Sequence, residues 1–240
     1  MFNSSITADD AFVGPIRLQK SSRRPAGSPE SFIYLRGAQV YAGSFQRGAL
    51  VRIVTGCVCL FQTLRDGRRQ ILDVLGPGQI FGAGQIFGAG LCATVSLGAV
   101  AMAETQLEEI NGEIDASGRA DILQRLLGRS RAHATLLGLK TVPEKTATAL
   151  LDLATQFPIT GVDAARNTSS FKLHLTRADL ADWLGMTLET VSRCLNDFKR
   201  NGLIEFDRPS VITILKRDTL LSIASGRHTP EETKHPERLP

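Results

Sequence analysis

The sequence predicts an α+β protein with an N-terminal antiparallel β-roll (jelly roll), a long dimerisation helix and a C-terminal winged helix-turn-helix. Three observations support this fold class. Short β-branched segments alternate with glycine turns over residues 32–118. Apolar residues change to helical spacing over 119–141. A helix, a glycine turn, a second helix and a hairpin then follow one another within 142–225. Each pattern has the period of the element it predicts.

Composition limits the classes of protein to consider. The chain has 240 residues, of which 42% are hydrophobic and 22% charged, as in ordinary globular proteins. These values exclude a wholly disordered chain, a collagen and a small disulfide scaffold. No apolar run approaches the roughly 20 residues that cross a bilayer, so no membrane association is expected. The net charge of +4 is small and spread along the chain, which permits nucleic-acid binding without arguing for it.

The two ends of the chain are polar. Residues 1–31 are rich in serine and contain Pro25 and Pro29 but no apolar h-region. We therefore expect a flexible N-terminal arm rather than a secretory signal, and a flexible tail over 226–240. Four cysteines in this length do not form a disulfide framework. A reducing, cytoplasmic location is the corresponding expectation.

Strands are expected in order through the first domain, over residues 32–118. Ala49–Val54 is short and β-branched, and Cys57–Phe61 follows a turn. The dipeptide Asp66-Gly67 predicts a hairpin that leads into the apolar stretch Arg69–Leu75. Short strands separated by glycines are typical of an antiparallel barrel or jelly roll.

A tandem copy of six residues lies in the same domain. Gln79–Gly84 reads QIFGAG, and Gln85–Gly90 repeats it at once. The copy is too short to be a repeat architecture. It is either a small insertion that lengthens a loop or a remodelled ligand or contact loop.

The expected helix over 119–141 carries an apolar stripe. The stripe consists of Ile122, Leu126, Leu127, Leu136, Leu137 and Leu139. A helix of this length with one apolar side suits the seam of a dimer. Packing against its own domain is the alternative.

Residues 142–225 are expected to form the winged helix-turn-helix domain. Pro143 opens a helix, and 159–170 is a polar loop. The stretch Thr176–Asp179 starts the next helix with a capping pattern. After the turn Gly185–Thr187, a second helix runs over Leu188–Phe198, with Gly202 as its C-terminal cap. Two strands and a turn over 203–215 complete the wing.

The second helix of this unit carries the chemistry of base recognition. Glu189, Ser192 and Arg193 share one face, because they lie at i, i+3 and i+4. Arginine donates twice to guanine, glutamate accepts from the cytosine amino group, and serine contacts a base edge or a phosphate. The expected backbone anchors are Thr176, Arg177, Thr187 and Thr190. The alternative is a solvated polar face on an ordinary three-helix unit.

The segment Leu175–Ile214, with its Glu-Thr-Val-Ser-Arg string over 189–193, resembles the DNA-binding domain of the CRP/FNR superfamily of bacterial transcription regulators. The string is similar to the E-x-x-S-R signature of the FNR/FixK-like branch. Val54–Gly56, Asp66–Ile71 and Pro77–Gly82 resemble the β-roll of the same family. The resemblance covers about residues 32–225. It implies a homodimer that binds palindromic double-stranded DNA with TTGAT-type half-sites and recruits RNA polymerase.

Two departures from the family bear on cofactors. The stretch Gly90–Ser96 lacks the arginine that would hold a cyclic nucleotide phosphate, so cyclic AMP is not expected. Residues 1–56 contain no cysteine, which excludes the N-terminal iron–sulfur cluster of oxygen sensors. No cofactor and no metal are therefore predicted, and the sequence does not identify a small-molecule effector. The alternative function is a ligand-, haem- or redox-gated regulator that binds DNA only with an effector in the β-roll.

A few single residues suggest further chemistry. Cys57 and Cys59 lie on one side of an expected strand, either as a thiolate site with Cys92 or as small buried hydrophobes. His133 lies near the dimer stripe, as a polar residue that sets register or as a metal or pH switch. Oxidation of Cys194 on the second helix would hinder DNA binding if that thiol is reactive. No phosphate loop, metal cluster or nucleophile elbow occurs, so an enzyme is not expected.

Overall fold

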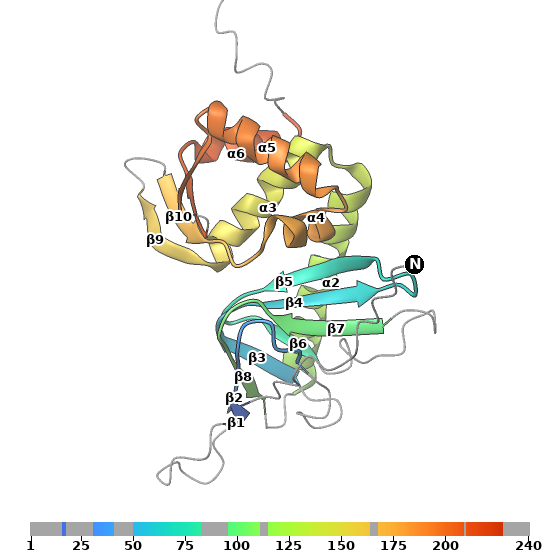
Figure 1. Cartoon of the computed structure of the whole chain (residues 1–240). Coiled ribbons are helices and arrows are strands. Elements are labelled where there is room, and N and C mark those ends of the chain that lie inside the picture. The colour runs from blue at the N-terminus through green and yellow to red at the C-terminus, as the bar shows by residue number, and fades with distance from the viewer. Residues whose placement is uncertain are drawn as a thin grey trace, which may run out of the picture.

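The structure is a computed structural model that describes residues 16–17, 31–40, 50–82, 96–110, 115–163, 168–208 and 210–227. In this part of the chain, two packed sheets form an N-terminal domain, and helices with a small sheet form a C-terminal one (Figure 1). The second copy of the six-residue repeat and Gly90–Val95, which bears on cyclic AMP, lie outside the described residues. So does Cys92, and so do nearly all of the expected arm and tail.

The N-terminal domain is an antiparallel β-roll, as predicted. One sheet has the order β1-β2-β8-β3-β6 and the other β5-β4-β7. The strands are β1 Ile16–Arg17, β2 Ser31–Tyr34, β3 Leu50–Thr55, β4 Val58–Thr63, β5 Arg69–Leu75, β6 Ile80–Gly82, β7 Ser96–Ala101 and β8 Thr105–Glu109. The expected Asp66-Gly67 turn joins β4 to β5, with Gly67 at a φ of 86°. Within the segment expected as a flexible arm, β1 pairs with β2.

The residues around β4 divide between two hydrophobic cores. Val58 is buried between the two sheets, together with Tyr34, Ile53 and Phe81. Cys57 and Cys59 are fully buried in a second core that continues into the C-terminal domain. One sheet of the roll therefore contributes to both domains, and the two domains share a packed boundary.

The long helix α2 spans Ala116–Leu139, and Asp115 caps it by accepting a hydrogen bond from the amide of Gly118 at 2.9 Å. The predicted apolar stripe mixed two faces of this helix. Ile122 and Leu126 line a cavity against the roll, and Leu136 is buried, whereas Leu127 is exposed. Leu123, absent from the prediction, is 65% exposed. Residues at i and i+4 share a face, so Leu123 and Leu127 form an outward apolar face.

The C-terminal domain packs three helices on a fourth. These are α3 Val142–Gln156, α4 Arg177–Leu184, α5 Leu188–Arg200 and α6 Arg217–Ala224. Its sheet has the order β11-β12-β10-β9, with β9 Pro158–Asp163, β10 Thr168–Lys172, β11 Ile204–Arg208 and β12 Val211–Ile214. The prediction of a polar loop over 159–170 is therefore wrong, because β9 and β10 occupy this range. Strand β10 lies between β9 and β12, and this pairing stabilises strands that the polar sequence does not favour locally.

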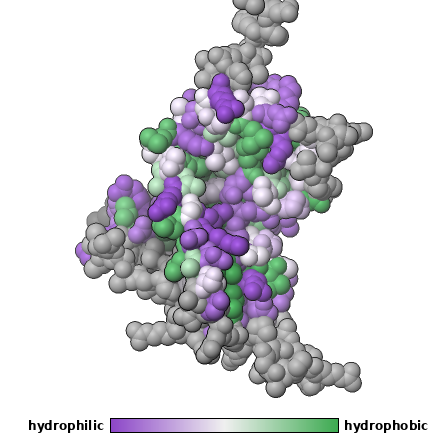
Figure 2. Space-filling view, turned by 180° about the vertical axis from the view of Figure 1, so that it is seen from behind, coloured by the Kyte–Doolittle hydropathy of each residue, from purple (hydrophilic) through white to green (hydrophobic). Residues whose placement is uncertain are grey.

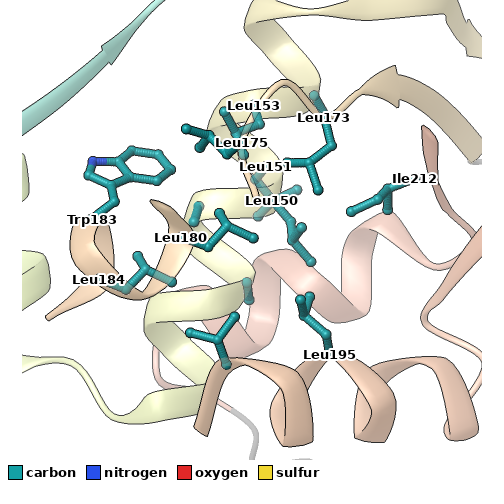
Figure 3. Close-up of a cluster of buried hydrophobic side chains, with 14 of the residues drawn as sticks. Leu150, Leu151, Leu153, Leu173, Leu175, Leu180, Trp183, Leu184, Leu195 and Ile212 are labelled. Carbon is teal, nitrogen blue, oxygen red and sulfur yellow. The ribbon is translucent and has the colours of Figure 1, made fainter. Parts of the chain in front are cut away.

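Leucines of α3 form the centre of this domain. Figure 3 shows Leu150 among side chains that arrive from α4, α5 and β12, including Leu180, Leu195 and Ile212. All four side chains are at most 2% exposed. The core therefore fixes α4 and α5 relative to each other from beneath.

The outer surface is mixed in character. Seen from behind, small green patches are interspersed with purple residues over the described surface (Figure 2). No helix among the described residues is both long and apolar enough to span a membrane.

Candidate nucleic-acid interface

The first helix of the candidate site, α4, has the predicted capping box at its start. The amide of Asp179 donates to the hydroxyl of Thr176 at 3.1 Å, and the Asp179 carboxylate accepts from the amide of Thr176 at 2.9 Å. The helix ends at Gly185, which has a φ of 61° and donates to the carbonyl of Ala181. This left-handed residue allows the sharp turn into the next helix.

The second helix, α5, begins at a threonine cap and buries one face. The hydroxyl of Thr187 accepts from the amide of Thr190 at 3.1 Å and shares a 2.8 Å hydrogen bond with the Thr190 hydroxyl. Val191, Leu195 and Phe198 are fully buried, as their spacing predicts. The opposite face of α5 is therefore presented to solvent.

The three predicted base-reading residues lie on this solvent face. The side chains of Glu189 and Arg193 are 71% and 77% exposed and form an ion pair at 2.5 Å. Ser192 is half-buried beside them. The fold thus brings together an acceptor, a hydroxyl and a guanidinium within the first two turns of α5.

The predicted site residues do not include Leu188, the first residue of α5. It is 52% exposed and directly precedes Glu189. The available signal was its position, because the buried stripe of α5 begins only at Val191. An exposed leucine beside the polar face gives this surface an apolar contact as well.

Two cations converge on Phe206 of β11, next to the start of α4. The guanidinium of Arg177 lies 5.0 Å from the ring centroid and the ammonium of Lys199 lies 5.7 Å from it. The Nη1 atom of Arg177 is buried and has no hydrogen-bond partner among the described residues. Burial lowers the pKa of Arg177. Positive charge is thus held where α4, α5 and the hairpin meet.

Both halves of the chain match known protein families. A Crp-like helix-turn-helix domain matches residues 144–223, and a cyclic nucleotide-binding domain matches residues 36–114. The nitrogen fixation regulation protein FixK of Rhizobium meliloti (strain 1021) is 31% identical over 196 residues, covering 80% of this chain and 86% of its own. The chain belongs to the CRP/FNR family of transcription regulators.

Other members place this regulator in the FixK-like branch. The transcriptional activator protein FnrL of Cereibacter sphaeroides is 32% identical over 178 residues, covering 72% of each chain. The solved structure of FixK2 from Bradyrhizobium japonicum superposes with a TM-score of 0.65 at 27% identity, covering 81% of this chain and 96% of its own. The protein is therefore a CRP/FNR-type transcription regulator with a helix-turn-helix DNA-binding domain.

The CRP/FNR regulator holds Cys194 on the buried side of α5. Its Sγ lies 4.0 Å from the carbonyl oxygen of Val142, and burial raises the pKa of its thiol to about 11. Thiolate is the reactive form, so this environment argues against ready oxidation. The Cys59 thiol is likewise held in its protonated form, because a hydrogen bond with Cys57 and burial raise its pKa.

His133 lies between the domains rather than on the outward face of α2. Its ring stacks on Trp183 of α4, with ring centroids 6.5 Å apart and an interplanar angle of 9°. Burial lowers its pKa. Over the described ranges, no three His, Cys, Asp or Glu side chains gather in a way that could hold a metal ion.

Proposed function

We propose that this CRP/FNR regulator binds, as a homodimer, a palindromic FNR/FixK-like site with TTGAT-type half-sites in double-stranded DNA. We further propose that it acts in the cytoplasm and recruits RNA polymerase from such sites. The observation that carries the proposal is the exposed face of α5, where Glu189, Ser192 and Arg193 lie together above a fully buried stripe. A major groove admits a helix whose first turns reach the base edges.

Each side chain on this face matches a base edge. Arg193 donates to O6 and N7 of guanine, and Glu189 accepts from the amino group of the paired cytosine. In the free protein these two side chains pair with each other, so this contact gives way when each binds a base. Leu188 supplies an apolar contact for a thymine methyl group, the apolar feature of the major groove.

The backbone anchors gather at the starts of the two helices. The hydroxyls of Thr176 and Thr187 cap α4 and α5, and Thr190 lies in the first turn of α5. Helix N-termini favour phosphate through their free amides and dipole. Arg177 and Lys199 add positive charge beside Phe206.

The outward face of α2 supports the dimer. Leu123 and Leu127 are exposed, and the same face continues through Ser130 and Ala134, which are also exposed. This i, i+4, i+7, i+11 spacing is that of a coiled-coil seam. A second copy of α2 would cover both leucines and set the distance between two recognition helices.

A second candidate function is effector-gated DNA binding. A cavity of about 210 Å³ lies between the roll and α2, and its lining includes Gln79, Ile80, Ile122, Arg125 and Leu126. A small molecule bound there would contact both the roll and the helix that leads to the DNA-binding domain. In that case the purified protein would need an additive before it binds DNA specifically.

Fluorescence anisotropy tests the proposal. As-purified protein is titrated onto a TTGAT-type palindrome and a scrambled duplex at fixed salt, because affinity for DNA depends steeply on salt. Specific binding without additives supports the proposal. Folded dimer without specific binding would favour the effector-gated candidate.

The variant Arg193→Ala then tests the base contact. It should cost roughly 1–3 kcal/mol on the palindrome and much less on the scrambled duplex. Arg65→Ala removes the same charge at an exposed arginine of the β4–β5 turn. This control variant should bind both duplexes as the wild type does. Equal losses on both duplexes would refute base reading by Arg193.

A further inference from the structure

An arginine side chain of the β-roll binds α4, the first helix of the helix-turn-helix. Arg69 of β5 donates through Nη2 to Oδ1 of Asp179 at 2.6 Å and through Nε to Oδ2 of Asp182 at 2.9 Å. Next to it, the Gln70 side chain donates to the carbonyl oxygens of Asp182 and Trp183 at 2.5 and 3.3 Å. These contacts join residues more than a hundred positions apart, and Figure 1 shows β5 running beneath α4.

Asp179 uses its two oxygens for two different partners. Oδ1 accepts from Arg69, while Oδ2 accepts from the amide of Thr176 at 2.9 Å and from its hydroxyl at 2.6 Å. Thr176 is the cap of α4 and one of the proposed phosphate anchors. A continuous set of hydrogen bonds therefore runs from the roll, through one carboxylate, to the start of α4.

The negative charge of the carboxylates on α4 would repel the phosphates of DNA. Asp179 and Asp182 place two carboxylates on α4, and a carboxylate in the first turn competes with a phosphate for the positive end of the helix. Arg69 lies between them and is only 33% exposed, while Asp179 is 9% exposed, so solvent screens this pairing weakly. The ring of Phe61, 5.8 Å from the guanidinium, further fixes the arginine.

We propose that Arg69 is a positioning residue for DNA binding: it neutralises Asp179 and holds that carboxylate on Thr176, so that a phosphate can approach the start of α4. The inference rests on the proposed function, because it takes α4 as a backbone-contacting helix. It assigns the roll a direct electrostatic part in DNA affinity, without any effector.

The experiment compares five variants by anisotropy on the palindrome and on the scrambled duplex over a range of salt. Arg69→Gln should weaken binding roughly tenfold at low salt on both duplexes, because unscreened carboxylates near a phosphate repel it. The ratio of its Kd to that of the wild type should shrink as salt rises. Arg69→Lys keeps the charge but loses the two-pronged contact with Asp179 and Asp182, so it should lose much less affinity than Arg69→Gln.

Three further variants separate the effect of charge from that of structure. In the double variant Arg69→Gln with Asp179→Asn, removal of the carboxylate should restore most of the lost affinity. The matched control is Arg68→Gln, the neighbouring arginine, whose side chain is 76% exposed and pairs with Asp66. It should bind as the wild type does. Thermal unfolding shows which variants are folded, and Asp179→Asn alone, expected to bind at least as tightly as the wild type, tests the idea if Arg69→Gln does not fold.

Three results would overturn the inference: unchanged or tighter binding by Arg69→Gln, a loss that is equal at all salt concentrations, or a loss that Asp179→Asn does not relieve. Failure of the proposed function looks different. In that case the wild type itself would not prefer the palindrome, while the effect of Arg69 on the scrambled duplex would still be measurable.

Discussion

Both carboxylate oxygens of Asp73 on β5 accept hydrogen bonds from the guanidinium of Arg129 on α2. Nε lies 2.8 Å from Oδ2 and Nη2 lies 2.5 Å from Oδ1. Arg129 also donates to the carbonyl oxygen of Val74 at 3.1 Å and lies 3.5 Å from Asp152 of α3. The roll, the long helix and the DNA-binding domain therefore meet at one guanidinium. Burial alone would lower the pKa of Arg129, but the carboxylates of Asp73 and Asp152 raise it above the ordinary value.

Loss of this arginine should destabilise the protein. Arg129→Ala leaves Asp73 and Asp152 partly buried without their cation, which costs about 3 kcal/mol. The free energy of unfolding from urea titration measures the effect. Arg131→Ala, at an exposed arginine two residues along, should stay within about 0.5 kcal/mol of the wild type. Similar values for the two variants would contradict the role of Arg129.

A side chain at Gly185, in the turn of the helix-turn-helix, should destabilise the protein. Gly185 has a φ of 61°, and a Cβ there would lie 3.1 Å from Cδ2 of Leu137 on α2. Gly185→Ala should cost about 1–2 kcal/mol, from the left-handed backbone and from crowding. Gly202→Ala is the control, because Gly202 has a φ of 63° with nothing within 4 Å. It should show the backbone cost alone, and an equal cost for both variants would rule out the contact with Leu137.

Dimer formation should depend on the outward face of α2. Leu123→Glu and Leu127→Glu each place a charge within the proposed seam, and each should raise the dimer dissociation constant at least tenfold, since burying an unpaired charge is costly. Sedimentation velocity over a concentration range measures this. Leu139→Glu is the matched control, because Leu139 is 81% exposed near the helix end and lies on a different face. A dimer that both seam variants leave intact would place the interface elsewhere.

Stability should fall in mild acid because of His174. Burial, with Lys172 and Arg36 nearby, lowers the pKa of His174 from 6.5 to about 4. The unfolded chain therefore takes up a proton that the folded protein refuses, and stability is lost as the pH falls from about 6.5 toward 4. The loss from this group should be about 2 kcal/mol, allowing for its partial exposure. His174→Gln should flatten the pH dependence of the free energy of unfolding in this window, and an unchanged slope would contradict the assignment.

Local patterns predicted the elements whose stability is local. The cap at Thr176, the turn at Gly185 and the buried stripe from Val191 to Phe198 follow from spacing and residue type, and the structure confirms them. The strands β9 and β10 were missed because β12 and their mutual pairing stabilise them. The apolar residues of α2 were assigned to one stripe because sequence does not show which leucines meet the roll.

Contacts between the domains could not be predicted at all. The pairs of Arg69 with Asp179 and of Arg129 with Asp73 join residues 110 and 56 positions apart. Each of these side chains resembles an ordinary surface charge in the sequence. Only the folded arrangement shows that they lie at the boundary between the roll and the DNA-binding domain.

Trp183 is the only tryptophan of the chain, and it lies at this boundary. It is 4% exposed, stacks on His133 of the long helix, and its carbonyl oxygen accepts from Gln70 of the roll. Indole fluorescence from this protein therefore comes from this one side chain. The emission of the unlabelled protein is therefore an intrinsic optical signal of domain separation, readable in real time during DNA or effector titrations.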